Sequence, residues 1–168
     1  LKKHLEKLCH RSVKQKRLKE LGKPTKPMSY HMIFRGDPGT GKTMTAGLVG
    51  KLLCALKIIP ESTMRVVNLA DMKAKFVGQT AHLMRDTFKE PGVYFIDEAY
   101  TIKERKDDSY GSEILSCLCE ILENRRHEIV VIMAGYKREM KALLRHNSGL
   151  SSRFHWIFDF ARYTQPEL

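Results

Sequence analysis

A glycine-rich stretch, Gly36-Asp37-Pro38-Gly39-Thr40-Gly41-Lys42-Thr43, follows a short, largely apolar segment at residues 31–34. It satisfies the pattern G-x-x-x-x-G-K-[ST] completely, and its glycines allow successive backbone N–H groups to face one anion. The loop opens a helix predicted at residues 42–57, whose positive dipole end favours phosphate. We expect residues 36–44, ending at Met44, to bind a nucleotide, with Lys42 on its β- and γ-phosphates and Thr43 on Mg²⁺. The alternative is a plain glycine-rich turn between a strand and a helix.

A second candidate site is the pair Asp97-Glu98, which ends the apolar run Val93-Tyr94-Phe95-Ile96. Open α/β sheets bind ligands at the carboxyl ends of their strands, where this pair is predicted to lie. Asp97 fits a magnesium ligand that acts through water, and Glu98 can orient or deprotonate a water that attacks a γ-phosphate. The pair predicts hydrolysis rather than phosphoryl transfer to a small molecule. The alternative is an acidic strand end that caps the next element.

The elements that must position these residues alternate along the chain. Apolar runs predict strands at 31–34, 64–70, 93–97, 129–135 and 156–160, and helical periodicity predicts helices at 1–21, 42–57, 80–89, 112–124 and 137–146. Strands that are apolar almost throughout are typical of a parallel sheet covered on both faces. The prediction is therefore an α/β fold with a five-stranded parallel sheet, in a chain whose 168 residues suffice for one domain.

The composition excludes several classes of protein. No apolar run approaches the ~18 residues of a membrane helix, and the Lys-rich start lacks the apolar core of a signal peptide. The four cysteines, at 9, 54, 117 and 119, have neither C-x-x-C spacing nor a histidine pair that would complete a zinc site. We interpret them as reduced thiols in an intracellular compartment, either the cytoplasm or, if a targeting segment precedes Leu1, an organelle.

The net charge of +11 is uneven, because residues 1–26 contain ten Lys or Arg and two Glu. Such a segment could bind nucleic acid or an anionic membrane. Its charges alternate with leucines at helical spacing, however, and no aromatic residues interleave for base stacking. We therefore expect the solvated face of a packed helix, without a nucleic-acid or membrane partner. The expected organisation is a basic helix and linker at 1–27, a nucleotide-binding domain at 28–163, and the start of a further helix at 164–168, where Thr164 and Glu167 fit a capping box.

Seven segments together resemble AAA+ ATPases, in particular the CbbX/SpoVK group that includes the red-type rubisco activase. In order, they are "GDPGTGKT", "FVGQTA", "GVYFIDEAY", "SYGSEIL", "LENRR", "VVIMAGYKREM" and "GLSSRF". The resemblance covers essentially the whole chain, and "FIDEAY" and "AGY" are more specific to this group than the phosphate loop. It implies a P-loop NTPase αβα domain with strand order 5-1-4-3-2, followed at 164–168 by the start of a truncated helical lid. It also implies ATP and Mg²⁺, a hexameric ring with a site at each subunit interface, and a pore that pulls on a protein client.

The resemblance also assigns residues outside the two motifs. Arg153 aligns with the arginine finger that acts in trans on the neighbouring subunit's nucleotide, although the residue type alone also fits a surface salt bridge. Phe76-Val77-Gly78 aligns with an aromatic pore loop that grips an extended polypeptide, the alternative being a Phe packed under the sheet. Tyr136 stands where many AAA+ proteins have an Asn that positions the attacking water. It is either a sensor or a residue at the edge of the core.

The predicted function is Mg²⁺-dependent ATP hydrolysis coupled to the remodelling of an unknown protein client. Two rivals remain: an AAA+ ATPase associated with nucleic acid, such as a helicase loader, and a nucleotide-gated scaffold that does not hydrolyse. Because the lid and its sensor-2 arginine are missing from this segment, we expect the segment alone to bind nucleotide weakly, assemble poorly and hydrolyse slowly.

Overall fold

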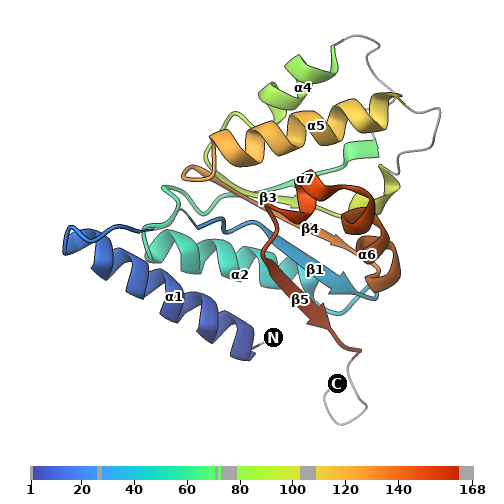
Figure 1. Ribbon diagram of the computed structural model, residues 1–168. Coiled ribbons are helices and arrows are strands. Elements are labelled where there is room, and N and C mark those ends of the chain that lie inside the picture. The colour runs from blue at the N-terminus through green and yellow to red at the C-terminus, as the bar shows by residue number, and fades with distance from the viewer. Residues whose placement is uncertain (1, 26–27, 71, 73–78, 103–108, 163–168) are drawn as a thin grey trace.

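Five parallel strands form one sheet in the computed structural model, which describes residues 2–25, 28–70, 72, 79–102 and 109–162. The strands are β1 (Met32–Gly36), β2 (Met64–Val67), β3 (Gly92–Ile96), β4 (Ile129–Gly135) and β5 (Trp156–Phe160). They lie in the order β2-β3-β4-β1-β5 (Figure 1). This is the predicted order 5-1-4-3-2 counted from the other edge, so the predicted fold class and topology are confirmed.

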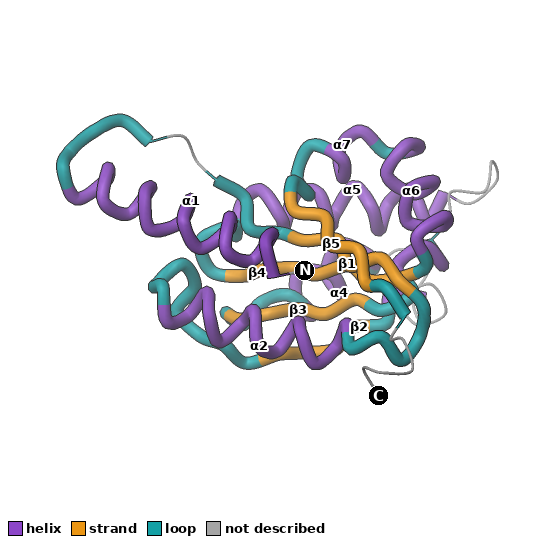
Figure 2. The backbone as a smooth tube through the Cα atoms, turned by 90° about the horizontal axis from the view of Figure 1, so that it is seen from below, coloured by secondary structure: helices purple, strands orange, loops and turns teal. Residues whose placement is uncertain are grey.

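Helices cover both faces of the sheet (Figure 2). One face carries α1 (Lys2–Glu20) and α2 (Lys42–Ala55), and the other carries α4 (Thr80–Thr87), α5 (Ser109–Asn124), α6 (Lys137–His146) and α7 (Ser148–Ser151). Successive side chains of a strand point to opposite faces, so a sheet covered twice needs apolar residues at every position. In β1, Ile33 joins the core under α5, whereas Met32 and Phe34 join the core under α2.

The ends of several elements differ from the prediction. The predicted strand 64–70 stops at Val67, since the Asn68 side chain accepts a hydrogen bond from the Ala70 N–H at 3.0 Å and turns the chain. The helix predicted at 80–89 ends at Thr87, and the helix predicted at 112–124 begins earlier, at Ser109. The short 3₁₀ turn η1 (Ala99–Thr101) and α7 were not predicted.

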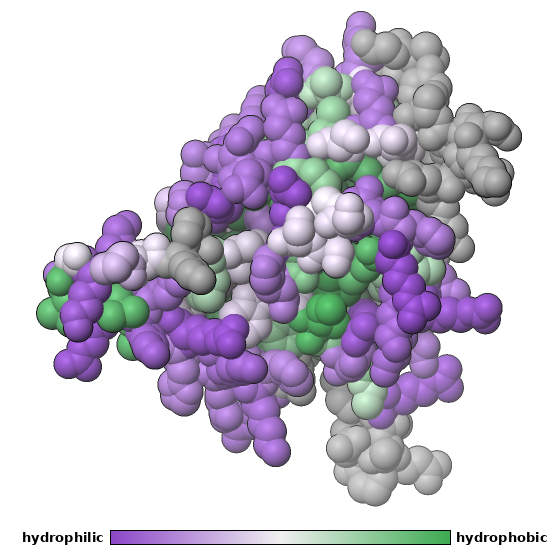
Figure 3. All heavy atoms as spheres, viewed as in Figure 1, coloured by the Kyte–Doolittle hydropathy of each residue, from purple (hydrophilic) through white to green (hydrophobic). Residues whose placement is uncertain are grey.

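The basic helix α1 packs through a narrow face. Leu8 is fully buried, Leu5 is partly buried against the same core, and the buried Ser12 hydroxyl donates to the Leu8 carbonyl at 2.8 Å. Val13 and Leu21 are exposed, so not every apolar residue of this helix contributes to its packed face. Hydrophilic side chains cover most of the visible surface of α1 (Figure 3). Within the described residues, no helix is long and apolar enough to cross a membrane.

A buried histidine joins the start of β1 to two other elements. The Val131 N–H donates to Nδ1 of His31 at 3.0 Å, and Nε2 lies 2.9 Å from the Leu122 carbonyl oxygen. Because Nδ1 accepts, the ring proton resides on Nε2 and is donated to Leu122. Burial lowers the pKa of His31 to about 4; the hydrogen bond to Leu122 and the charge of Glu123 oppose this shift, and the charge of Arg153 adds to it. His31 is therefore neutral at pH 7 and ties β1 to β4 and to the end of α5.

Candidate nucleotide-binding site

The phosphate loop and the acidic pair lie at the same edge of the sheet. The loop follows β1, and Asp97-Glu98 follow β3, with β4 between these two strands. All three strands are parallel, so the two segments leave the sheet at its carboxyl edge. Neighbouring strands lie ~4.8 Å apart, which puts the two segments ~10 Å from each other. This spacing is suited to a phosphate chain with a metal ion beside it.

The glycines of the phosphate loop serve two different purposes. Gly39 and Gly41 have φ angles of +73° and +84°, in the left-handed region that side chains with a Cβ rarely adopt. Gly41 is also the N-cap of α2, so the loop amides continue directly into the helix N-terminus. Gly36 instead provides room, because a Cβ there would lie 2.6 Å from the carbonyl oxygen of Phe160 in β5.

Lys42 is buried, and its ammonium group folds back over the loop. Nζ donates to the carbonyl oxygens of Gly36 at 2.9 Å and Asp37 at 2.7 Å. The Thr40 hydroxyl also donates to the Asp37 carbonyl, at 2.7 Å. The ammonium group is thus held at the concave side of the loop, where an anion bound by the loop amides would meet it.

The polar groups at this edge fit a phosphate and a magnesium ion. Thr43 and Asp97 are exposed, and both offer the hard oxygen ligands that Mg²⁺ prefers. No group of three or more His, Cys, Asp or Glu that could hold a metal ion occurs in the described part of the chain. A cation held by one or two protein oxygens together with substrate phosphates is the kind of site that Mg²⁺ commonly uses. Met44, in the first turn of α2, is strongly exposed beside Thr43.

Glu98 has an uncommon backbone conformation. Its φ and ψ are 48° and 39°, in the left-handed region, which costs a non-glycine residue about 1–2 kcal/mol. Its N–H donates to the Asp97 carboxylate at 3.0 Å, and both side chains are exposed. The turn that carries this strain lies directly at the acidic pair, as is common at functional sites.

Tyr100 lies beside Glu98 and contacts a second tyrosine, Tyr136. The rings of Tyr100 and Tyr136 lie 5.8 Å apart, and a Cβ on Gly135 would lie 2.7 Å from the Tyr100 ring. Burial raises the pKa of Tyr100, and so do the charge of Glu98 and a hydrogen bond to its side chain. Tyr136 follows directly after β4, the strand between the two motifs, as the N-cap of α6, and it is exposed. Our sequence reasoning singled out Tyr136 but gave Tyr100 no role of its own.

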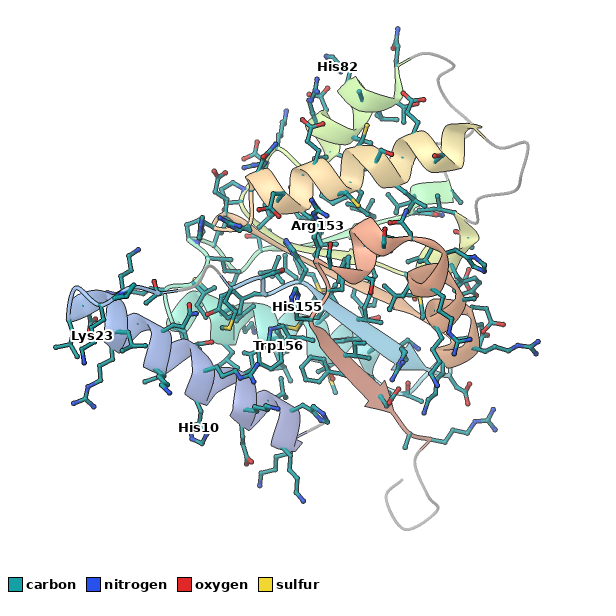
Figure 4. All side chains as sticks on the ribbon, in the orientation of Figure 1. His10, Lys23, His82, Arg153, His155 and Trp156 are labelled. Atoms are coloured by element: carbon teal, nitrogen blue, oxygen red, sulfur yellow. The ribbon has the colours of Figure 1, made fainter. Side chains whose placement is uncertain are left out.

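The structure places Arg153 away from the phosphate loop of its own chain. Trp156 at the start of β5 pairs with Met32 at the start of β1, so Arg153 precedes the amino end of these strands. The phosphate loop follows their carboxyl end, about four residues or ~13 Å farther along. Figure 4 shows Arg153 near His155 and Trp156 where β5 begins, away from the tip of β1. Nε of Arg153 also lies 3.7 Å from Oε2 of Glu123, an ion pair of the kind expected if Arg153 formed a surface salt bridge.

The predicted pore loop, Phe76-Val77-Gly78, lies outside the described residues, as do residues 164–168. The pore-loop assignment therefore stays a prediction.

Comparison with known proteins agrees with this geometry. The family model described as "ATPase family associated with various cellular activities (AAA)" matches residues 32–162. Stage V sporulation protein K of Bacillus subtilis is 38% identical over 158 residues, covering 93% of this chain and 49% of that protein. A CfxQ homolog of Galdieria sulphuraria is 39% identical over 152 residues, covering 89% of this chain and 50% of that protein.

A third relative is the ESX-3 secretion system protein EccA3 of Mycolicibacterium smegmatis. It is 37% identical over 156 residues, which are 90% of this chain and 26% of that protein. The chain thus spans about half of the length of the first two relatives and about a quarter of the third. The family match includes the phosphate loop, the acidic pair and Arg153 in one continuous segment. The chain therefore belongs to the AAA family of ATPases, and its resemblance to the CbbX/SpoVK group is confirmed.

Proposed function

We propose that this chain binds ATP with Mg²⁺ at the carboxyl edge of its sheet and hydrolyses it with Glu98 as the general base. The observation that carries the proposal is the meeting of a complete phosphate loop with Asp97-Glu98, two strands apart on one edge. Family membership supports ATPase activity in general. The position of both motifs at one edge of the sheet supports the assignment to particular residues.

Each residue has a role that its position allows. The loop amides and Lys42 bind the phosphates of ATP, and Thr43 and Asp97 would hold Mg²⁺. When bound, Mg²⁺ neutralises charge on the phosphate oxygens. Glu98 accepts a proton from the attacking water as its oxygen forms a bond to the γ-phosphorus. The bond to the β,γ-bridging oxygen breaks, and the products are ADP and phosphate.

Arg153 acts, in this proposal, on the nucleotide of a second copy of the chain. Its place at the amino end of the strands separates it from its own phosphate loop, which supports action on the nucleotide of another subunit. A guanidinium beside the transferring phosphoryl group stabilises the charge of the transition state, by ~10³–10⁵ in rate in other systems. AAA proteins usually oligomerise, and we propose a hexameric ring.

The work done by hydrolysis is, we propose, the remodelling of a protein client. Phe76-Val77-Gly78 would contact that client in a central pore. The names of the relatives refer to a sporulation protein and to secretion-system proteins, and neither name indicates nucleic acid. A nucleotide-dependent pull-down with Glu98→Gln tests this point. The bound protein should be released when ATP is removed, and equal capture with and without ATP would argue against a client.

The catalytic assignment is tested by phosphate release from the intact protein that contains this chain. Glu98→Gln keeps the size of the side chain but removes the base, and should lower kcat by ~10²–10⁴ while ATP still binds. Glu6→Gln, at an exposed position of α1, is the control and should hydrolyse at the parent rate. If Glu98→Gln also hydrolyses at the parent rate, Glu98 is not the base.

A further inference from the structure

The side chain of Arg153 is anchored at three points. Nη1 donates to the Gly149 carbonyl at 2.9 Å and to the Ser152 hydroxyl at 3.3 Å. Nε is buried, has no hydrogen-bond partner among the described residues, and lies 3.7 Å from Oε2 of Glu123. The backbone is anchored as well, since the Ser29 hydroxyl donates to the Arg153 carbonyl at 2.7 Å. These contacts use Nε and Nη1, so Nη2 can serve a further acceptor.

Glu123 divides its carboxylate between two arginines. Oε1 accepts from Nη1 of Arg126 at 2.7 Å, a short charge-assisted hydrogen bond, while Oε2 faces Arg153 at the longer distance. The side chain of Glu123 is 49% exposed, and exposed ion pairs contribute little to stability. The stability of the fold therefore does not explain why Glu123 pairs with both arginines. The two pairs instead fix the guanidinium groups of Arg126 and Arg153 relative to each other.

The same side chains line a cavity of about 240 Å³ at the amino end of β5. Arg11, Arg126 and Arg153 contribute to its wall together with Glu123, and two of these arginines, Arg126 and Arg153, pair with that carboxylate. Arg11 is held in turn by Trp156, with its guanidinium carbon 5.7 Å from the ring centroid. Three arginines against one glutamate give the wall a net positive charge, which favours an anion. In the motif "LENRR", sequence reasoning found only a family signature and assigned no role to Glu123 or Arg126.

We propose that Glu123 is the positioning residue for Arg153, holding Nε so that the guanidinium is presented to a phosphate carried by a second copy of the chain. Arg126 holds the other carboxylate oxygen and keeps Glu123 from turning to solvent. The inference rests on the proposed trans action of Arg153. A free arginine must lose its rotamer freedom in the transition state, whereas an anchored one has lost it beforehand.

The expected kinetic effect follows from that lost freedom. Glu123→Gln in the intact protein lowers kcat about three- to tenfold and leaves KM for ATP within about twofold. Glu123→Asp, which keeps the charge but withdraws it by one methylene, changes kcat in the same direction. The matched control is Glu120→Gln, on the same helix and in an exposed ion pair with Arg85 at 3.8 Å, which leaves kcat unchanged. A fall in kcat for the control equal to that for Glu123→Gln overturns the inference.

A double-mutant cycle tests whether Glu123 acts through Arg153. Once Arg153→Ala has removed the guanidinium, adding Glu123→Gln lowers kcat no further. An additional three- to tenfold loss in the double variant means that Glu123 acts elsewhere, and it overturns the inference. If Arg153→Ala itself leaves kcat unchanged, the proposed trans action fails, whatever Glu123 does.

Mixing two variant chains distinguishes action on a neighbouring subunit from a structural role within one chain, because only the first lets one chain restore ATP hydrolysis in another. Chains with Glu123→Gln keep their own Glu98, and chains with Glu98→Gln keep an intact Arg153. Mixed assemblies hydrolyse ATP faster than the sum of the two preparations measured separately, because a neighbouring subunit supplies the positioned guanidinium. Mixing Arg153→Ala with Glu98→Gln gives the same gain. If only the Arg153→Ala mixture gains, Glu123 does not position Arg153; if neither mixture gains, the trans proposal fails.

Discussion

Acidification from pH 7 to pH 5 should destabilise the chain through His31. In the folded chain its ring is buried and neutral, with a pKa of about 4, against an ordinary value of 6.5. Between these two values the unfolded chain binds a proton that the folded chain excludes. The contribution of His31 to stability is therefore complete above about pH 6.5 and is lost as the pH falls toward 4.

The size of the effect follows from the two pKa values. At pH 5 the linkage relation gives a loss of about 2 kcal/mol, and the full shift, reached below pH 4, corresponds to about 3 kcal/mol. Domains are commonly stable by about 5–15 kcal/mol, so a loss of this size is easily measured.

Urea unfolding at pH 7 and pH 5 measures the loss, with Trp156 as probe, since it is the only tryptophan and is nearly buried. Carboxylates titrate over the same range, so the informative quantity is the stability difference between the parent and His31→Gln. Gln can donate and accept but does not ionise. The parent should be the more stable of the two at pH 7, and its advantage should shrink by about 2 kcal/mol at pH 5.

His10→Gln, at an exposed position of α1, is the control for loss of an imidazole. The reasoning is refuted if the difference in free energy of unfolding between the parent and His31→Gln is the same at pH 7 and pH 5. His31 would then be protonated as readily in the folded chain as in the unfolded one.

Two further predictions concern the backbone around the site. Gly36→Ala should lower the free energy of unfolding by about 1–3 kcal/mol, because its Cβ would clash with Phe160. Gly47→Ala in α2 should stabilise by up to about 1 kcal/mol, since the nearest described atom outside its own stretch of helix is Met64 Sδ, at 4.0 Å. Urea unfolding of both variants checks the contrast; equal stabilities would contradict it. Glu98→Gly should relieve the left-handed strain and raise stability by roughly 1 kcal/mol or less, while phosphate release is lost. A less stable Glu98→Gly chain would show that the turn is not strained.

Much of the fold is predictable because strands covered on both faces leave a strong local signal. β3 and β4 are buried at every position and read as uninterrupted apolar runs. The end of β2 is less predictable, since apolar residues resume at Leu69 and Ala70 after a single polar residue, Asn68, whose side chain ends the strand by accepting a hydrogen bond from the Ala70 N–H. The four-residue α7 is too short to show any periodicity.

The site divides in the same way. The phosphate loop is a continuous segment whose conformation depends on its own glycines, so its pattern is visible in the sequence. The contacts of Tyr100 with Tyr136 and of Glu123 with Arg153 join residues that are 36 and 30 positions apart in the sequence. Neither contact has a local signal, because each depends on how the sheet brings the ends of separate elements together.

The separation of Arg153 from the phosphate loop limits the symmetry of any assembly that uses both. In a two-fold dimer the same patch of each subunit meets its copy, so the loop and Arg153 would have to share one patch. They instead follow and precede the same pair of strands, β1 and β5. Subunits joined through these two surfaces must therefore stack head to tail, which gives a closed ring or a growing filament. In an open chain, one terminal subunit would always retain an arginine without a nucleotide to act on.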